Sequence, residues 1–393
     1  MEKTITPEHN ILFCALALLL PVVGFFAPRS AAPLVSLIGV AYLILYRRRL
    51  DLSVIKEPLS LYMLLVGTYV IIGVSWSLDP DIAFTRWMKV TLMMVVTMPF
   101  LLSATKLNMT TGSILEKCMF AGIVLAVLSL VFHLCYSGGF YRLLKPTETH
   151  WDMLDAANRA VVTLSLLFSA FFVLTRRRMP NGTHWFVVII FLVLIAFTRS
   201  ESALLGGIAW LGAYASASYA PAVFSRLVAW GGITLIMAGP IVILLVEYLF
   251  GGATIPVRLG SADARMEIWY AVSNKILEAP ILGHGMEASR SIVEWPYTFQ
   301  RYIGPHIMHP HNGILQIWLD LGFLGALAGS VGWWWLVRGS SRFSDVDRPA
   351  VIAGLVLFLT VLSVSHGLWQ SWWIAAVLGS VTLTLLVAKP RQR

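Results

Sequence analysis

Charged residues are scarce in this sequence and make up only 12% of its 393 residues. Soluble domains carry about 25%, so this scarcity excludes a soluble enzyme, a disordered protein and a nucleic-acid-binding module. Hydrophobic residues reach 58%, and the mean hydropathy is +0.77. The composition predicts an all-α polytopic membrane protein, because the apolar runs suit helices better than the strands of a membrane barrel.

Cysteine is also rare. The three cysteines, Cys14, Cys118 and Cys135, show no paired spacing, which argues against a disulfide framework and a cysteine metal site. The net charge of +9 does not indicate a nucleic-acid partner, because the basic residues cluster in short segments between apolar runs. Such clusters instead report the orientation of a membrane protein.

The apolar runs predict about 12 membrane-spanning helices, since each span needs about 20 mainly apolar residues. We expect them to form a single integral membrane domain over residues 1–393. The first run lacks a clear signal-peptide cleavage site and is interpreted as a retained helix. The predicted spans are residues 11–27, 31–46, 59–76, 82–103, 119–136, 157–175, 185–199, 203–220, 228–250, 312–337, 349–365 and 367–388.

Four basic clusters set the predicted orientation. All four fall on one side of the membrane if there are 12 spans and both termini are cytoplasmic, as the positive-inside rule requires. The clusters are Arg47–Arg49, Arg176–Arg178, Arg338 with Arg342, and Lys389 with Arg391 and Arg393. This topology places residues 251–311, a large loop between spans nine and ten, on the outer side.

The large loop is balanced in charge and carries apolar residues throughout, so we expect it to be folded. A helical pattern starts near Ser261, a plausible N-cap, and places Arg265, Trp269, Val272 and Ile276 on one face. An arginine on an apolar face points to the membrane or to a cavity. Two interpretations remain open for Arg265, an anion contact and a cation–π contact with Trp269.

Several cations lie in or next to predicted spans, where charge is costly and is a functional candidate. Arg86 and Lys89 share a helix face in the fourth span, which indicates either a phosphate-binding site or snorkelling to the interface. Arg199 lies in a polar break between two spans, where it binds a ligand or pairs with Glu201. Arg159 begins the sixth span, as an interfacial anchor or a ligand contact.

The strongest local feature is the segment from His306 to Gly313, which contains His309 and His311. Its spacing is not a recognised zinc pattern and it holds no carboxylate, so no metal ion is expected. Asn312 is a predicted N-cap, and Asn312, Gln316 and Asp320 form one polar stripe on an apolar helix. A stripe of this kind must face a bundle interior or a water-filled cavity. His311 at its outer end is either a general base or an interfacial cap.

These motifs resemble a known family. His311-Asn312, nine residues and then Gly322-Phe323-Leu324-Gly325 is similar to the signature of O-antigen ligases. Arg265-x3-Trp269, followed by Gly283-His284-Gly285, is similar to the pattern of the wider ligase and polymerase superfamily. Many members place arginine directly after serine in a Thr-x-Ser-Arg segment, whereas here Glu201 follows Ser200 and Arg199 precedes it.

The resemblance implies a membrane glycosyltransferase with a GT-C-like architecture in the bacterial inner membrane, with its active site at the periplasmic face. The donor would be an O-antigen glycan on undecaprenyl diphosphate, and the acceptor a sugar hydroxyl of lipid A–core oligosaccharide. Transfer would be inverting, with no metal and no other cofactor. His311 would be the base, supported by Asn312, Trp269 and His309. The diphosphate would be bound by Arg86, Lys89, Arg159, Arg199 and Arg265.

Other functions fit the same sequence. An O-antigen polymerase would use the same donor with a second lipid-linked glycan as acceptor, and a protein O-oligosaccharyltransferase would use a protein acceptor. A lipid-linked glycan flippase belongs to a different class. Transporters usually place polar sites near the bilayer midplane and show internal repeats, whereas the cations here gather at the predicted outer side.

Overall fold

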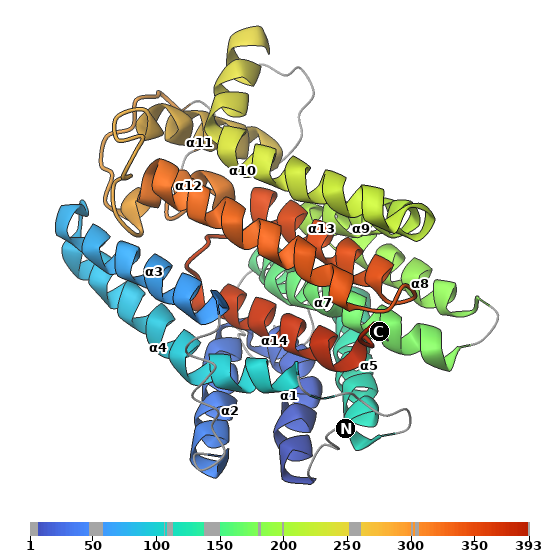
Figure 1. Ribbon diagram of the computed structural model, residues 1–393. Coiled ribbons are helices and arrows are strands. Elements are labelled where there is room, and N and C mark those ends of the chain that lie inside the picture. The colour runs from blue at the N-terminus through green and yellow to red at the C-terminus, as the bar shows by residue number, and fades with distance from the viewer. Residues whose placement is uncertain are drawn as a thin grey trace.

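The computed structural model of the protein describes residues 7–46, 58–105, 107, 113–136, 150–179, 182–198, 200–250, 261–299, 302 and 306–391. Within these ranges the regular structure is all helical, with no strand (Figure 1). The prediction of an all-α protein is therefore confirmed.

Each of the twelve predicted spans coincides with a helix among the described residues. Seven of these helices are long and apolar enough to cross a membrane, four are apolar but shorter, and one, Glu201–Tyr219, is in neither group, a pattern expected of a polytopic membrane protein. The twelve helices are α1 (Pro7–Phe26), α2 (Ala31–Tyr46), α3 (Pro58–Gly73), α4 (Pro80–Ala104), α5 (Ile114–Cys135), α7 (His150–Arg178), α8 (His184–Ala196), α9 (Glu201–Tyr219), α10 (Pro221–Phe250), α12 (Gly313–Gly339), α13 (Arg348–Val364) and α14 (Ser371–Val387).

Helix starts follow ordinary capping chemistry. The Asp79 side chain accepts a hydrogen bond from the Ile82 backbone N–H at 2.9 Å, and Pro80 opens α4. Ser113 caps α5 in the same way through the Glu116 N–H. These contacts satisfy N–H groups that a helix leaves unpaired at its first turn, so α4 and α5 each begin at a residue that can cap them.

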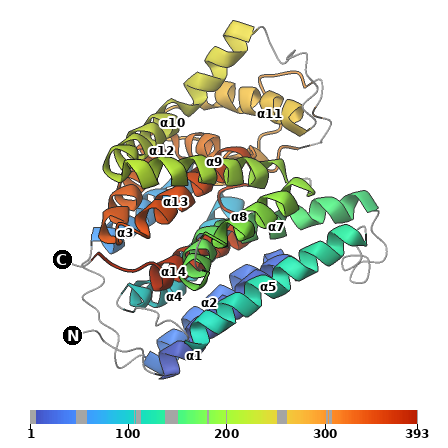
Figure 2. The ribbon, with the colours of Figure 1, turned by 90° about the vertical axis from the view of Figure 1, so that its right-hand side faces the viewer.

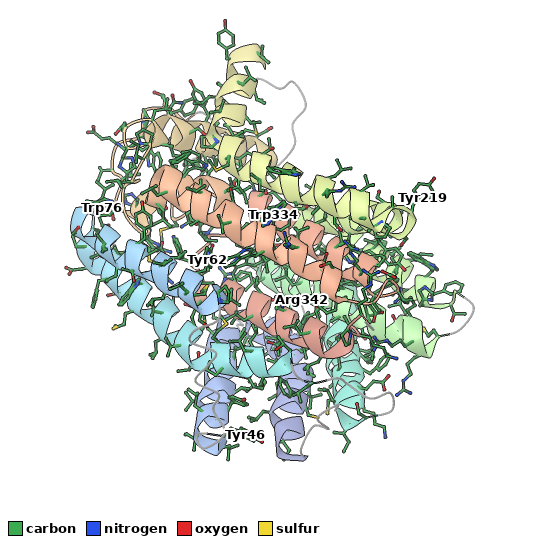
Figure 3. All side chains as sticks on the ribbon, in the orientation of Figure 1. Tyr46, Tyr62, Trp76, Tyr219, Trp334 and Arg342 are labelled. Carbon is green, nitrogen blue, oxygen red and sulfur yellow. The ribbon has the colours of Figure 1, made fainter. Side chains whose placement is uncertain are left out.

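The helices run roughly side by side in layers (Figure 2). Helices α1, α2 and α5 form one outer layer, and α9, α10, α12 and α13 lie on the opposite side of α7 and α14. Helix α7 is central, with 83% of its apolar window buried. Helix α3 packs along α12, where the Tyr62 hydroxyl donates to the Ala328 carbonyl at 2.7 Å. Figure 3 shows Tyr62 facing α12 and Trp76 beyond the end of α3.

A thirteenth long helix, α11 (Ser261–Ile276), lies in the loop predicted to be folded. It packs beside α10 and the start of α12, at the end of the bundle away from the chain terminus that follows α14 (Figure 2). Val272 and Ile276 are buried in a small core with Trp269 at its edge. The predicted apolar face of this helix is confirmed.

At the opposite end of the bundle, basic residues converge on a single buried carboxylate. Arg176 and Arg177 each contact an oxygen of Asp347 at 2.6 Å, and the Lys389 backbone N–H donates to Asp347 at 2.8 Å. The Arg391 N–H also donates to the Arg342 carbonyl. The described members of three predicted basic clusters therefore lie at one end of the protein.

Replacing Asp347 with alanine should destabilise the fold by about 3–5 kcal/mol, because it leaves two arginines and a backbone N–H without their partner. Thermal unfolding in detergent would measure this. Asp345→Ala is the matched control, because Asp345 is 68% exposed and lies 3.9 Å from Arg391. Equal stability of the two variants would show that the Asp347 cluster does not hold the helices together.

Candidate functional site

His311 stands at the start of α12 in a strained backbone conformation. Its φ is 54°, and only His311 and Glu287 have a positive φ among the described non-glycine residues. The next residue, Asn312, caps α12: its Oδ1 accepts hydrogen bonds from the Ile314 and Leu315 N–H groups at 3.0 and 3.1 Å. The predicted cap is thus confirmed. Strain held in place by a cap is typical of a functional position.

The end of α13 fixes the ring of His311. Its Nδ1 lies 2.9 Å from the Ser365 carbonyl oxygen. Because a carbonyl only accepts, Nδ1 carries the proton and Nε2 keeps its lone pair. Burial and the neighbouring Arg265 lower the pKa of His311 to about 4. The imidazole is therefore neutral at neutral pH, as a general base must be.

Arg265 on α11 binds the same end of α13. Its Nη1 donates to the Val364 carbonyl at 2.9 Å, so consecutive carbonyls of α13 hold the guanidinium and the imidazole as neighbours. Burial lowers the pKa of Arg265, and the charge of Glu201 opposes this shift. Trp269 uses its indole N–H to bind the Pro310 carbonyl at 3.0 Å. Helix α11 thus presents a cation to the site and holds the segment that carries His311.

Two more histidines surround His311. The His309 ring lies 4.2 Å from the His311 ring, between centroids. Burial, His311, Arg290 and Arg159 lower the pKa of His309 to about 3. Burial also holds the pKa of His366 well below its usual range, and charge on His309 and His311 adds to this. His366 was not predicted, because it stands alone in its segment and no spacing joins it to His311.

Arg159 belongs to the same region, since its charge acts on both His309 and His366. Its guanidinium lies over the Trp372 ring, 6.0 Å from the centroid. Arg199 lies outside the described residues. Its neighbour Ser200 donates to the Asn158 side-chain oxygen at 2.6 Å, and Ser202 contacts Ser365 at 3.2 Å. The polar break before α9 is therefore joined to the helix ends around His311.

Arg86 and Lys89 have different surroundings in the structure. Arg86 forms an ion pair with the buried Glu287 at 2.7 Å, and Arg290 pairs with the other oxygen of the same carboxylate. Lys89 is exposed and has no hydrogen bond or ion pair with any described residue. The anion that the Arg86–Lys89 face predicted is, for Arg86, a carboxylate of the protein itself. A ligand contact by either residue remains a prediction.

The polar stripe of α12 faces the interior, as predicted, and Gln316 and Asp320 are 1% and 0% exposed. Gln316 accepts from the Leu368 N–H at 2.7 Å, and Asp320 accepts from the Trp369 indole at 2.6 Å. Asp320 also binds the backbone N–H groups of Glu287 and Ala288 at 3.1 Å. The loop between α13 and α14 (residues 365–370) is thus held against the stripe.

Helix α12 breaks at Gly322, and the break explains the glycine motifs. Gly322 has φ 60° and ψ −156°. The freed carbonyls of Leu319 and Asp320 accept hydrogen bonds from His284 and Gly285, and the Phe323 N–H donates to the Pro280 carbonyl. Irregular backbone inside a membrane protein is tolerated where other protein groups satisfy it. The Gly283–Gly285 segment therefore packs against the break at Gly322. Its backbone hydrogen bonds join two motifs that are far apart in the sequence.

Gly322→Ala should lower both the unfolding temperature and the rate of the reaction at the site around His311. A Cβ at this position would lie 2.4 Å from the Ile281 carbonyl carbon and oxygen, and a positive φ is unfavourable for alanine. Gly212→Ala is the control, because nothing lies within 4 Å of its new Cβ and alanine favours helix. A Gly322→Ala variant as stable and active as Gly212→Ala would show that the packing of residues 283–285 against the break does not require a glycine at position 322.

The three histidines come from two segments, residues 309–311 and the loop between α13 and α14. Among the described residues, no group of three or more His, Cys, Asp or Glu side chains is arranged to hold a metal ion. The region instead combines neutral imidazoles with guanidinium groups. Such a set can remove a proton from a hydroxyl and bind a charged phosphate beside it.

Known proteins are similar in sequence to this chain. A putative polysaccharide ligase of Rickettsia conorii is 28% identical over 290 residues, covering 70% of this chain and 67% of the relative. A protein of the same name from Rickettsia typhi is 29% identical over 293 residues, covering 70% and 68%. No solved structure matches. The sequence profile of the O-antigen ligase family matches residues 163–329. The predicted resemblance to the O-antigen ligase family is confirmed over residues 163–329 of this chain.

Proposed function

We propose that this protein is an O-antigen ligase, which transfers a glycan from undecaprenyl diphosphate to a sugar hydroxyl of lipid A–core oligosaccharide. One observation carries the proposal. His311 is half-buried and neutral, its Nδ1 is bound to the Ser365 carbonyl, and Arg265 binds the adjacent carbonyl of the same helix end. A base and a cation side by side suit the transfer of a sugar from a diphosphate to a hydroxyl.

The proposed reaction is a single displacement. The acceptor hydroxyl oxygen attacks the anomeric carbon of the donor sugar while its proton passes to Nε2 of His311. The bond from the anomeric carbon to the phosphate oxygen breaks, and undecaprenyl diphosphate leaves with the electron pair. Attack opposite the leaving group inverts the anomeric configuration. Arg265 and Arg159 stabilise the charge that grows on the diphosphate, so the reaction needs neither a metal nor another cofactor.

The proposed topology has 12 spans, both termini in the cytoplasm and the site at the periplasmic face of the inner membrane. Its support is the separation of charge along the bundle. The basic cluster around Asp347 lies at the C-terminal end of α7, whereas Arg159 lies 17 residues before Arg176 on the same helix, about 26 Å away at 1.5 Å per residue. The positive-inside rule then puts the site on the outer side, with residues 251–311 as a periplasmic loop in one GT-C-like membrane domain.

The curated relatives favour a ligase over the other candidates, since they are named as polysaccharide ligases. A polymerase, a protein O-oligosaccharyltransferase and a flippase predict different products. In the first the glycan stays on undecaprenyl diphosphate, in the second it appears on protein, and in the third it crosses the membrane unchanged.

A transfer assay with the purified protein tests the proposal. Lipid-linked O-antigen is supplied with or without lipid A–core, with EDTA in a parallel series, and the products are separated on a gel. We expect glycan on lipid A–core only when both substrates are present, with no effect of EDTA. Longer glycan on undecaprenyl diphosphate without lipid A–core would make the protein a polymerase. Activity lost in EDTA and restored by a divalent ion would refute the metal-free mechanism.

A further inference from the structure

Two buried ring nitrogens beside His311 have no role in the reaction described above. They are Nδ1 of His309 and Nε2 of His366, and neither has a hydrogen-bond partner among the described residues. Buried polar groups in proteins are nearly always paired, and an unpaired one calls for an explanation. Here two such nitrogens lie close to one candidate base. This indicates a ligand that forms the missing hydrogen bonds with both.

Packing fixes both rings. The His309 side chain lies against Gly367, where an added Cβ would approach the His309 Cβ and Cγ to 3.0 Å. His366 packs edge-on against Trp372, with 4.8 Å between ring centroids and an interplanar angle of 77°. Gly367 and His366 belong to residues 365–370, which also bind His311 and the α12 stripe. The two imidazoles are thus held in a fixed relation to the base.

The charge of the region selects the chemistry of the ligand. Both imidazoles are neutral, because burial and the nearby arginines disfavour their charged forms. A neutral imidazole has one donor and one acceptor nitrogen. It therefore matches a hydroxyl, which also donates and accepts, whereas phosphate oxygens mainly accept and suit the guanidinium groups of Arg159 and Arg265. The arginines and the histidines thus fit different parts of the reactants.

We propose that His309 and His366 form an acceptor subsite that binds sugar hydroxyls next to the hydroxyl that His311 deprotonates. The inference rests on the proposed function and adds to it the place of the acceptor. The acceptor sugar lies among the three histidines, between the start of α12 and residues 365–370. Its hydroxyls satisfy His309 Nδ1 and His366 Nε2, and these contacts choose the hydroxyl that reaches His311.

Paired substitutions separate hydrogen bonding from packing. His309→Asn keeps a polar atom near the Nδ1 position and His366→Gln keeps one near Nε2, whereas His309→Leu and His366→Leu keep only bulk. We expect each leucine variant to raise the KM for lipid A–core about tenfold, the effect of one lost hydrogen bond. The asparagine and glutamine variants should stay within about threefold of the native KM. The KM for the lipid-linked donor should not change.

His184→Leu is the matched control. The Nδ1 of His184 is also buried without a partner among the described residues, but His184 opens α8 and packs against Phe172, near the C-terminal end of α7 and away from Arg159. It should leave both KM values unchanged. If the leucine variants at 309 and 366 keep the native acceptor KM, or if asparagine and glutamine are as harmful as leucine, the histidines only pack and the subsite is refuted.

A binding measurement keeps this result apart from the transfer assay. Lipid A–core is titrated into the full chain in nanodiscs without donor, and the ring nitrogens of ¹⁵N-histidine are followed by NMR. The resonances of His309 Nδ1 and His366 Nε2, assigned with His309→Asn and His366→Gln, should shift in the native protein. Unchanged resonances would refute the subsite even if a leucine variant failed to fold. Shifts without any glycan transfer would retain the subsite and refute the proposed ligase activity.

Discussion

His311→Ala should reduce the rate of glycan transfer by about 10²–10⁴-fold, the usual contribution of a general base. The protein should still fold, because Asn312 rather than His311 caps α12. The acceptor hydroxyl would then lose the group that takes its proton in the proposed reaction, since Nε2 of His311 is the nitrogen left open by the Ser365 contact. Single-turnover transfer with saturating donor and acceptor would measure the effect on the chemical step.

The control for this variant is His306→Ala, which removes an exposed imidazole from the same segment. It should keep its activity. Native activity in His311→Ala would remove His311 as the base and leave the interfacial interpretation. An equal loss in both variants would mean that the whole segment is disturbed, so a third measurement, the unfolding temperature, accompanies the rates.

The pH profile gives an independent test of His311. The neutral form is the active one, so the rate is lost as the pH falls through the pKa. Because burial and Arg265 lower that pKa to about 4, kcat/KM should stay level from neutral pH down to about pH 5. A bound diphosphate offsets the charge of Arg265, so the acid limb of kcat should lie at a higher pH than that of kcat/KM. A limb at the ordinary histidine pKa in kcat/KM would contradict the burial of the base.

Arg265→Ala should lower transfer by about 10²–10³-fold, the usual cost of losing one donor to a charge that develops in the transition state. The guanidinium also holds the Val364 carbonyl, next to the carbonyl that orients His311. Arg265→Lys should recover only part of the rate, because an ammonium group does not make the bidentate contact with phosphate that a guanidinium makes. Steady-state rates over a range of donor concentrations would show both effects.

Lys275→Ala is the control on the same helix. Lys275 pairs with Glu278 at 2.6 Å and has no contact with the histidine segment among the described residues, so its loss should leave transfer unchanged. Full activity of Arg265→Lys would show that only charge matters at this position. Full activity of Arg265→Ala would assign the arginine to the fold and remove it from the diphosphate site.

Each predicted span lies on a helix among the described residues, because an apolar run of membrane length has few alternatives to a helix. Most ends agree within a few residues, but α5, α7 and α10 begin five to seven residues earlier than predicted. The sequence also predicted α11 from the spacing of Trp269, Val272 and Ile276, and the cap at Asn312. These features depend on neighbours within two or three turns. The inward direction of Gln316 and Asp320 followed from their helical spacing, since a polar stripe avoids lipid.

Contacts between distant segments had no local signal. Nothing in the pattern around His366 connects it to His309, although Gly367 lies against that side chain. Likewise, the interval between Arg86 and Glu287 gives no indication of their ion pair. The sequence therefore predicted an open phosphate site at Arg86, whereas in the folded chain Arg86 contacts the carboxylate of Glu287.

The sequence by itself determined the class of this protein, the positions of its helices, the capped histidine and the resemblance to the O-antigen ligase family, because composition and short-range spacing set all of these. Only the tertiary structure decided which side chains meet. It brought residues 365–370 to His311, closed the Gly283–Gly285 segment on the break at Gly322, and paired Arg86 with Glu287. These contacts come from the packing of helices against one another, which residue spacing along the chain does not encode.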